Sequence, residues 1–349
     1  MTDIKVDCLD AAEANLSQDV VHFAEAGGTK ALDHDPRWLA VLARGLNHTP
    51  YLLCARRGME VAGILPLSYL KSVLFGRFLV SLPYLNGGGV LATDPQIAER
   101  LIDRAIELAG HLDVRFVEFR QSSPLSHPEL SESRSDKCHM RLALSPSKDE
   151  LWKQLPSKVR NQVRKGEQQG FAVDWGREEC LADFYEVFSH NMRDLGTPVY
   201  GSSLFREILN HFANESELCL LRLGDRPVAA ALLLHGNTVT EVPSASSLRK
   251  FNSTNANMYM YWQLLCRAVE RGNRTFDFGR STPGSGTYRF KEQWGAKPEP
   301  SVWQYHVRRG VAHQMRPDNA RFGRLIRIWR RLPVPLTRLI GPTIVRGIP

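Results

Sequence analysis

The stretch LCLLRLGDRPVAAALLLHG, from Leu218 to Gly236, consists of two apolar runs on either side of the turn sequence Gly-Asp. Glycine readily adopts the left-handed backbone of a tight turn, so this stretch predicts a β-hairpin of two buried strands. Roughly 160 residues earlier, YLLCARRGMEVAGILPL from Tyr51 to Leu67 has the same order of apolar run, glycine turn and apolar run. The same hairpin is therefore expected twice.

Each hairpin is followed further along the chain by an amphipathic helix and a short strand. In the first half these are residues 96–109 and VRFVEFR (114–120), and in the second half they are residues 256–271 and RTFDFGR (274–280). A hairpin, a helical crossover and a strand parallel to its neighbour together build a mixed sheet. The sequence therefore predicts an α/β (α+β) fold with two similarly built halves. A chance similarity between two strand-turn-strand patterns is the alternative.

The domain boundaries follow from length and composition. A chain of 349 residues, 43% of them hydrophobic, exceeds what one core usually organises, so two domains are expected. The segment SSPLSHPELSESRSDKCHM, residues 122–140, is rich in serine, proline and charge and is typical of an exposed connector. We expect a first domain over residues 1–135, a second over residues 136–310 and a basic tail over residues 311–349.

The net charge of +8 is concentrated in that tail. From Arg316 onward, eight arginines stand against one acid, Asp318, and leave a charge of +7. The remaining chain is nearly neutral, so a generally basic, nucleic-acid-binding body is not indicated.

The tail also has a helical pattern. Phe322, Leu325, Ile326 and Trp329 are spaced as one apolar stripe of an amphipathic helix that ends before Pro333. Such a helix can lie on an anionic membrane surface, and the alternative is that its stripe packs on the protein's own body.

Other classes of protein are disfavoured by what the sequence lacks. Six cysteines are scattered without a CxxC pair and eleven histidines show no HExxH or HxH spacing, so we expect reduced, mostly buried thiols and no metal site. The longest aliphatic run, Val228–Leu234, is too short to span a bilayer, and the polar, acidic start is unlike a secretion signal. We expect a cytoplasmic protein.

Several segments together are similar to FemAB-type proteins, a family of peptidoglycan-bridge-type aminoacyltransferases. They are DPRWLAVLARGL, VAGILPLSYL, FGRFLVSLPYLNGGGV, LPSKVRNQVRKGEQQGF and, above all, FDFGRSTPGSGTYRFKEQWGA. The ensemble spans roughly residues 30–345 and most resembles the subgroup associated with exosortase and exopolysaccharide gene clusters. The resemblance implies two GNAT-like (acyl-CoA N-acyltransferase-like) domains in tandem, and transfer of an acyl or aminoacyl group onto an amine.

The resemblance also implies the substrates. The best-known members of the family add amino acids from aminoacyl-tRNA to cell-wall precursors, so the expected acceptor is an amine-bearing saccharide or cell-envelope precursor. Acyl-CoA or aminoacyl-tRNA is the expected co-substrate, without a tightly bound cofactor. The coiled-coil arm that some tRNA-using members insert is not seen here, and neither is the Arg/Gln-x-x-Gly-x-Gly/Ala loop of many acetyl-CoA enzymes in its usual place. The donor and the oligomeric state therefore stay open.

The segment from Asp277 to Gly295 is the richest candidate site, because a strand ending in FDFGRS runs into the loop TPGSG. Lys291 matches the lysine of the family's aromatic-Lys motif and could hold a phosphate or stabilise an oxyanion. The alternative for the segment is a surface loop with solvated cations. For Arg280 the alternative is a structural ion pair with Asp277 or Glu292. The expected catalytic residues are Lys291, Tyr288 and Asp277. The expected donor- or substrate-binding residues are Arg280, Ser281, Gly284, Gly286, Arg289, Arg160, Arg164, Arg249 and Lys250.

Arg160 and Arg164 are one turn apart on a helix that Ser157 is expected to cap, and Arg249 and Lys250 precede a helix that begins near Asn255. No GxSxG elbow or Cys/His/Asp arrangement is apparent, so the sequence favours direct transfer over a covalent intermediate. The predicted function is an acyl- or aminoacyltransferase. The alternative is a catalytically silent, GNAT-like adaptor that recruits exopolysaccharide enzymes to the membrane.

Overall fold

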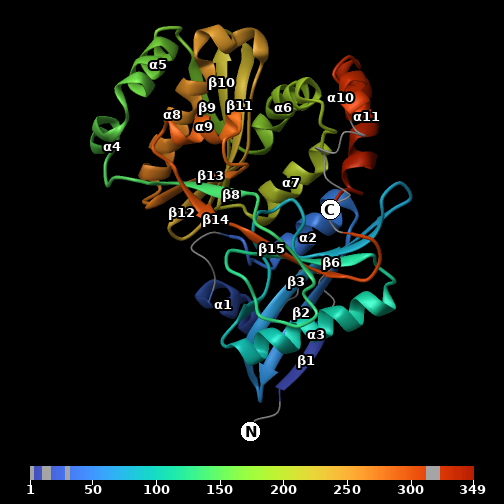
Figure 1. Cartoon of the computed structure of the whole chain (residues 1–349). Helices are drawn as coiled ribbons and strands as arrows, with labels where there is room; N and C mark the ends of the chain where they lie inside the picture. The colour runs from blue at the N-terminus through green and yellow to red at the C-terminus, as the bar shows by residue number, and fades with distance from the viewer. Residues whose placement is uncertain (1–3, 10–16, 28–31, 312–322) are drawn as a thin grey trace. The chain divides into compact units, whose positions relative to one another are not determined.

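The computed structural model describes residues 4–9, 17–27, 32–311 and 323–349. The chain forms two compact units, each built around one mixed sheet (Figure 1). Unit 1 comprises residues 1–137, 300–324 and 342–349, and unit 2 comprises residues 138–299 and 325–341. The predicted mixed α/β architecture in two halves is confirmed.

Unit 1 has its sheet in the order β1-β2-β3-β4-β6-β15-β7, with β5 paired to β3. Its strands are β1 (Ile4–Leu9), β2 (Thr49–Arg57), β3 (Glu60–Ser72), β4 (Gly76–Val80), β5 (Leu91–Ala92), β6 (Phe116–Gln121), β7 (Glu132–Arg134) and β15 (Val302–Val307). Its helices are α1 (Gln18–Gly27), α2 (Arg37–Leu46) and α3 (Pro95–His111).

Unit 2 has its sheet in the order β14-β8-β13-β12-β11-β10-β9. Its strands are β8 (Cys138–Ala143), β9 (Ala172–Gly176), β10 (Ser216–Leu223), β11 (Arg226–His235), β12 (Val239–Ser247), β13 (Thr275–Ser281) and β14 (Lys297–Pro300). Its helices are α4 (Lys148–Gln154), α5 (Ser157–Glu167), η1 (Glu178–Cys180), α6 (Leu181–Leu195), α7 (Ser202–His211), η2 (Arg249–Thr254), α8 (Ala256–Glu270), α9 (Gly286–Glu292) and α10 (Gly323–Trp329). The last helix, α11 (Val334–Val345), begins in unit 2 and ends in unit 1.

The duplicated order of elements is present in both units. The hairpins β2–β3 and β10–β11 turn at Gly58 (φ 65°) and Gly224 (φ 58°), as the glycine positions predict. The crossover through α3 makes β6 parallel to β4, and the crossover through α8 makes β13 parallel to β12.

The core of unit 2 lies on both faces of β11. Ala229, Ala231 and Leu233 belong to the cluster that includes α8, while the alternating residues, buried as well, point to the opposite face, where α6 packs. A continuous apolar run is the sequence of a strand covered on both faces, which explains VAAALLL.

Three sequence expectations need correction. The predicted connector, residues 122–140, contains β7 and the start of β8, because both strands pair with neighbours in a sheet. β15, expected within the second domain at 136–310, pairs with β6 and so lies in the sheet of unit 1. Ser157 is the first residue of α5 rather than its cap, since Pro156 occupies the cap position without a side-chain hydrogen bond.

All six cysteines lie in described segments; five are buried, Cys8 is exposed, and none forms a disulfide. No helix among the described residues is long and apolar enough to cross a membrane.

Candidate active site in the second unit

Two parallel strands of unit 2 separate part-way along their length. β12 and β13 pair only from Val239 to Glu241 and from Thr275 to Asp277. At that level β12 carries a bulge against β11, and it contains Pro243, which has no backbone N–H to offer a neighbouring strand. We call the space between residues 242–247 of β12 and residues 278–281 of β13 the strand opening.

β13 bends away at Gly279. Its pairing with β8 shifts register between Asp277 and Arg280, and Gly279 has a φ of 78°, in the left-handed region that favours glycine. The Gly279 N–H donates to Oδ1 of Asp277 at 2.7 Å. The sequence Asp-Phe-Gly therefore builds a kink that aims the end of β13 away from β12.

Asp277 is fully buried, and its carboxylate fixes this kink. Besides Gly279, it accepts hydrogen bonds on Oδ2 from Nδ1 of His139 at 3.0 Å and from Nε of Arg141 at 2.9 Å. Burial alone would raise the pKa of Asp277, but the hydrogen bond and charge of His139, together with Arg141, lower it. The carboxylate is ionised and held on three sides.

Lys291 reaches the same kink from α9. Its Nζ donates to the backbone carbonyls of Gly279 and Arg280, both at 3.0 Å, and the side chain is buried. Burial lowers the pKa of Lys291 to about 8, although the negative charge of Asp277 opposes the shift. An ammonium group has three N–H donors, and two acceptors are recorded for this one within the described ranges.

The glycine loop between β13 and α9 is open. Gly284 has a φ of 76°, and neither it nor Gly286 has an atom within 4 Å of where a Cβ would lie. Ser285 caps α9 by accepting from the N–H of Tyr288, and Arg289 donates twice to the Gly284 carbonyl, which steadies the loop.

The predicted residues of this segment thus fall around one kink. Tyr288 is half-buried against the core, Arg280 is half-buried, and Ser281 is buried with no hydrogen-bond partner recorded for its Oγ among the described residues.

Cations gather before α8. Arg249 donates to the Asp194 carbonyl at 2.8 Å, and Lys250 lies 5.1 Å from the ring of Phe251. Arg226, which the sequence analysis missed, lies 5.9 Å from the same ring. α8 begins after Asn255, a left-handed residue whose side chain makes no capping hydrogen bond, so this N-terminus has no side-chain cap.

α5 packs against this end of α8. A Cβ on Gly166 would come within 2.9 Å of the Asn255 carbonyl, so the close approach of the helices requires glycine. Arg164 lies over the ring of Trp152 at 5.4 Å, and Arg160 is half-buried with no partner recorded for its Nε in the described structure. These two arginines therefore line α5 rather than the kink at Gly279.

The corresponding position in unit 1 is filled by the chain itself. β4 and β6 pair only at Leu79 and Val80, and the loop NGGGV (86–90) then returns to the sheet, where the Gly89 N–H donates to the Arg120 carbonyl at 3.0 Å. A Cβ on Gly89 would lie 2.4 Å from Nε2 of Gln121, so the loop depends on glycine. The loop NGGGV is therefore packed against the sheet of unit 1.

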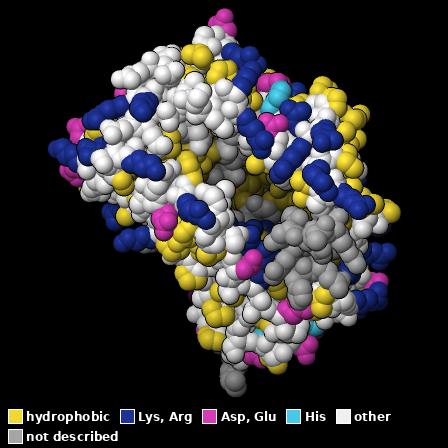
Figure 2. Space-filling model, turned by 45° about the horizontal axis from the view of Figure 1, so that its top comes forward, with side chains coloured by type: hydrophobic (Ala, Val, Ile, Leu, Met, Phe, Trp, Pro, Cys, Tyr) yellow, Lys and Arg dark blue, Asp and Glu magenta, His cyan; other side chains and the backbone are white. Residues whose placement is uncertain are grey.

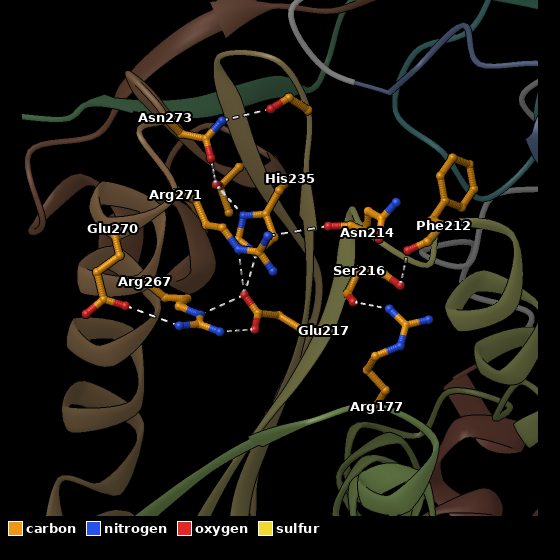
Figure 3. A network of polar contacts seen from close by, with 12 residues as sticks. Arg177, Phe212, Asn214, Ser216, Glu217, His235, Arg267, Glu270, Arg271 and Asn273 are labelled. Atoms are coloured by element: carbon orange, nitrogen blue, oxygen red, sulfur yellow. Dashed lines mark hydrogen bonds and ion pairs between the residues drawn. The ribbon is translucent and has the colours of Figure 1, made fainter.

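A hollow of ≈ 370 Å³ lies elsewhere in unit 2, between β9, η1, β10 and α8. Figure 3 shows Arg267 and Arg271, which line the hollow, directed at Glu217 together with His235. Glu217 accepts from Nε2 of His235 at 2.8 Å and from Nε and a terminal nitrogen of Arg267 at 2.9 and 2.7 Å. Burial would raise the pKa of Glu217, but the bonds from His235 and Arg267 outweigh it and lower the pKa to about 2.

The network continues through Nδ1 of His235 to the Thr240 hydroxyl and on to Asn273. Because Glu217 is held by its partners, we interpret the hollow as the outer side of a structural network that joins β10, β11 and α8. Within the described ranges, no group of three or more His, Cys, Asp or Glu side chains is arranged to hold a metal ion.

Comparisons with known proteins agree with this geometry. Residues 154–292, which include the strand opening, the Lys291 kink and α8, match the family described as "Acetyltransferase (GNAT) domain". No curated protein matches the chain in sequence.

Several solved structures share the whole fold. FemX is similar with a TM-score of 0.65 and 15% identity over 86% of this chain and 97% of its own. A tandem GNAT protein from the clavulanic acid biosynthesis pathway has a TM-score of 0.56 and 12% identity over 88% and 100%, and L-PGS from Bacillus licheniformis has 0.55 and 14% over 93% and 97%.

The fold is that of tandem GNAT-like proteins. Residues 154–292 of the second unit match the GNAT acetyltransferase family model and include an open pair of parallel strands, and the first unit has the same topology with that position filled.

Proposed function

We propose that this protein is a FemAB-type N-acyltransferase or aminoacyltransferase that uses unit 2 to hold the donor. The observation that carries the proposal is the contrast between the two units: β12 and β13 separate beside an uncapped helix N-terminus with cations, whereas in unit 1 the loop NGGGV packs against β6. The GNAT match to residues 154–292 supports the same unit.

The donor's phosphates are assigned to the start of α8. Uncapped N–H groups and the positive end of the helix dipole attract anions, and Arg226, Arg249 and Lys250 add positive charge there. Both acyl-CoA and aminoacyl-tRNA carry phosphate groups in addition to the reactive thioester or ester, so this feature suits either donor.

The reaction is direct transfer. A neutral amine of the acceptor attacks the donor carbonyl, the new C–N bond forms, the C–S or C–O bond breaks, and the amine proton leaves to solvent or to the departing group. Charge develops on the carbonyl oxygen in the transition state, and a donor aimed at that oxygen accelerates the step.

We assign that task to Lys291. Two of its N–H groups bind the carbonyls of the kink, which fixes the ammonium in place, and the third is left for the substrate's oxyanion or for a phosphate. Asp277 acts as a positioning residue, because it shapes the kink whose carbonyls hold Lys291. Ser281 ends β13, and Tyr288 and Arg289 lie on α9, so the three residues flank the neighbouring glycine loop.

The acceptor is proposed to be an amine-bearing saccharide or another cell-envelope precursor handled in the cytoplasm. This rests on the FemAB resemblance, including its exosortase- and exopolysaccharide-associated subgroup. It also rests on the fold shared with FemX and with the C-terminal domain of a putative lysylphosphatidylglycerol synthetase from Agrobacterium fabrum (TM-score 0.55, 12% identity over 84% of this chain and 92% of that domain).

Product formation tests the proposal. The purified chain is incubated with acyl-CoA or aminoacyl-tRNA and a panel of amino sugars, and mass spectrometry detects the acylated amine. We expect product with one donor class, and Lys291→Ala should reduce its rate by about 10²-fold, as losing one oxyanion contact does. Lys153→Ala, which removes an exposed lysine of α4, is the control. Absence of product together with absence of saturable donor binding would instead favour the silent adaptor.

A further inference from the structure

The basic tail is anchored to unit 2 by one side of its helices. Trp329 of α10 is buried, and a Cβ on Gly196, at the end of α6, would lie 2.5 Å from Ile326. Arg330 donates to the Leu195 carbonyl, and Arg338 of α11 donates to Ser189 and pairs with Glu186. Figure 1 shows α10 and α11 beside α6. The two helices are therefore held in a fixed orientation on this unit.

This packing corrects the predicted apolar stripe. Of its four members, Trp329 is buried, Ile326 is half-buried, Leu325 is exposed and Phe322 lies outside the described residues. The predicted stripe is thus divided between two sides, because the helix turns the larger aromatic side chain toward α6.

The outward side exposes a different set of aliphatic side chains. Leu325 and Ile328 of α10 are 60% and 58% exposed, and Leu336 and Leu339 of α11 are 40% and 75% exposed. Each pair is spaced three residues apart and so lies on one face of its helix. We call these four residues the leucine face.

Arginines border this face. Arg324, Arg327 and Arg331 are exposed and are spaced by three and four residues. Arg324 and Arg327 directly precede Leu325 and Ile328, and Arg331 follows Ile328 by three residues. Residues 323–349 contain six arginines and no acidic residue. Figure 2 shows yellow and dark blue side chains next to each other along the edge where α10 and α11 lie.

We propose that the leucine face and its arginines bind the surface of an anionic lipid bilayer. Aliphatic side chains gain by entering the headgroup–acyl boundary, and arginines at the same level gain from anionic headgroups. α10 has 7 residues and α11 has 12, so the helices lie along the surface and do not cross it.

A membrane fits this surface better than other anionic partners. RNA backbone binding uses cations and does not require four exposed aliphatic side chains, and a second copy of this chain would bring a like-charged arginine cluster to the interface. The proposal is independent of the proposed transferase activity, because none of these residues belongs to the strand opening or the kink.

Co-sedimentation of the full-length protein with vesicles is the test. We expect binding to phosphatidylcholine vesicles that contain phosphatidylglycerol, little binding to phosphatidylcholine alone, and weakening by salt. Two variants are compared, one with Leu325, Ile328, Leu336 and Leu339 changed to Asp, and one with Arg324, Arg327 and Arg331 changed to Gln. Each should lose at least about tenfold in vesicle affinity, because each removes several contacts with the bilayer.

Matched controls separate this from general effects. Changing Met59, Val73, Leu74 and Leu223 to Asp replaces four exposed apolar side chains elsewhere, and changing Arg44, Arg100 and Lys153 to Gln removes the same charge elsewhere; both control variants should bind vesicles like the wild type. Because the Asp variant could disturb folding, circular dichroism and transfer to a soluble acceptor are measured for each variant, and the Gln variant stands as the second probe.

Three outcomes would overturn the proposal: vesicle binding by both variants that equals binding by the wild type, loss of binding on changing the arginines but not the leucine face, or a lipid-free dimer that the Asp variant abolishes. The second outcome with matching loss of tRNA binding would indicate RNA as the partner, and the third a second copy of the chain.

Discussion

Lys291 is a charged side chain in a buried position, where desolvation disfavours the charged form. Its ammonium is buried, and burial lowers its pKa to about 8 from the ordinary value of 10.5. An aliphatic residue would avoid that cost. The carbonyls of Gly279 and Arg280 offset part of it, and they hold the ammonium at the end of β13.

The pKa of Lys291 predicts a pH dependence. If the protonated ammonium stabilises the oxyanion, kcat at saturating substrate should fall as pH rises through about 8, since the group then loses its proton. Lys291→Arg, whose guanidinium stays protonated, should remove that alkaline decline while retaining part of the rate. The pH profiles of both proteins decide the point. An unchanged decline in the arginine variant would assign it to another group.

Glu217 gives a prediction about stability. Its pKa is lowered from 4.5 to about 2 in the folded protein, so the folded state binds fewer protons than the unfolded state between these values. The stabilisation is present above pH 4.5 and is lost as pH falls toward 2. Glu217→Gln should lower the free energy of unfolding at neutral pH by on the order of 3 kcal/mol and should flatten this acid dependence.

Denaturant unfolding between pH 2 and 7 measures the effect. Glu299→Gln is the matched control, because Glu299 also pairs with an arginine, Arg141, but is half exposed; it should cost less than about 1 kcal/mol. Equal losses in the two variants would show that the network in Figure 3 is not a structural centre.

At the scale of elements, the bend of β13 determines where the site lies. The left-handed Gly279 carries the carbonyl that holds Lys291, so Gly279→Ala should strain the kink by about 1–2 kcal/mol and also reduce turnover. Gly224→Ala, in the β10–β11 turn, carries the same backbone cost with open space around the new Cβ and should leave turnover unchanged. Thermal unfolding and initial rates distinguish the two. Equal activity in both variants would show that the kink is not required for catalysis.

Elements with strong local patterns were predictable from the sequence. The hairpin at Gly224, the helix after Asn255 and the strand ending in FDFGR were expected within a residue or two of their observed limits, because apolar runs, glycine turns and helical periodicity are local signals. Lys291 and Asp277 were assigned to one segment for the same reason, whereas Gly279, which forms the kink, was not singled out.

Partners that come from distant parts of the chain were not predictable. His139 and Arg141, which bind Asp277, lie in or beside the segment interpreted as a connector; the alternation in CHMRLA was a strand signal that its serine-rich neighbours obscured. Trp329 is buried because it packs toward α6, and the helical spacing of apolar residues in the tail does not reveal that contact.

At the scale of the whole molecule, the two units share one topology but differ in the space between their two parallel strands. Unit 2 keeps its parallel strands apart after Asp277, and unit 1 closes the same position with glycines that approach β6. This asymmetry supports the proposal that the donor binds in unit 2.

Hydrogen exchange of the full chain with and without donor tests this claim most directly. We expect saturating acyl-CoA or aminoacyl-tRNA to slow amide exchange in residues 242–258 and 278–288, which form the strand opening, the start of α8 and the glycine loop. Protection confined to the loop at residues 81–90 of unit 1, protection confined to the hollow around Arg177 and Arg271, or no protection by either donor would contradict the account.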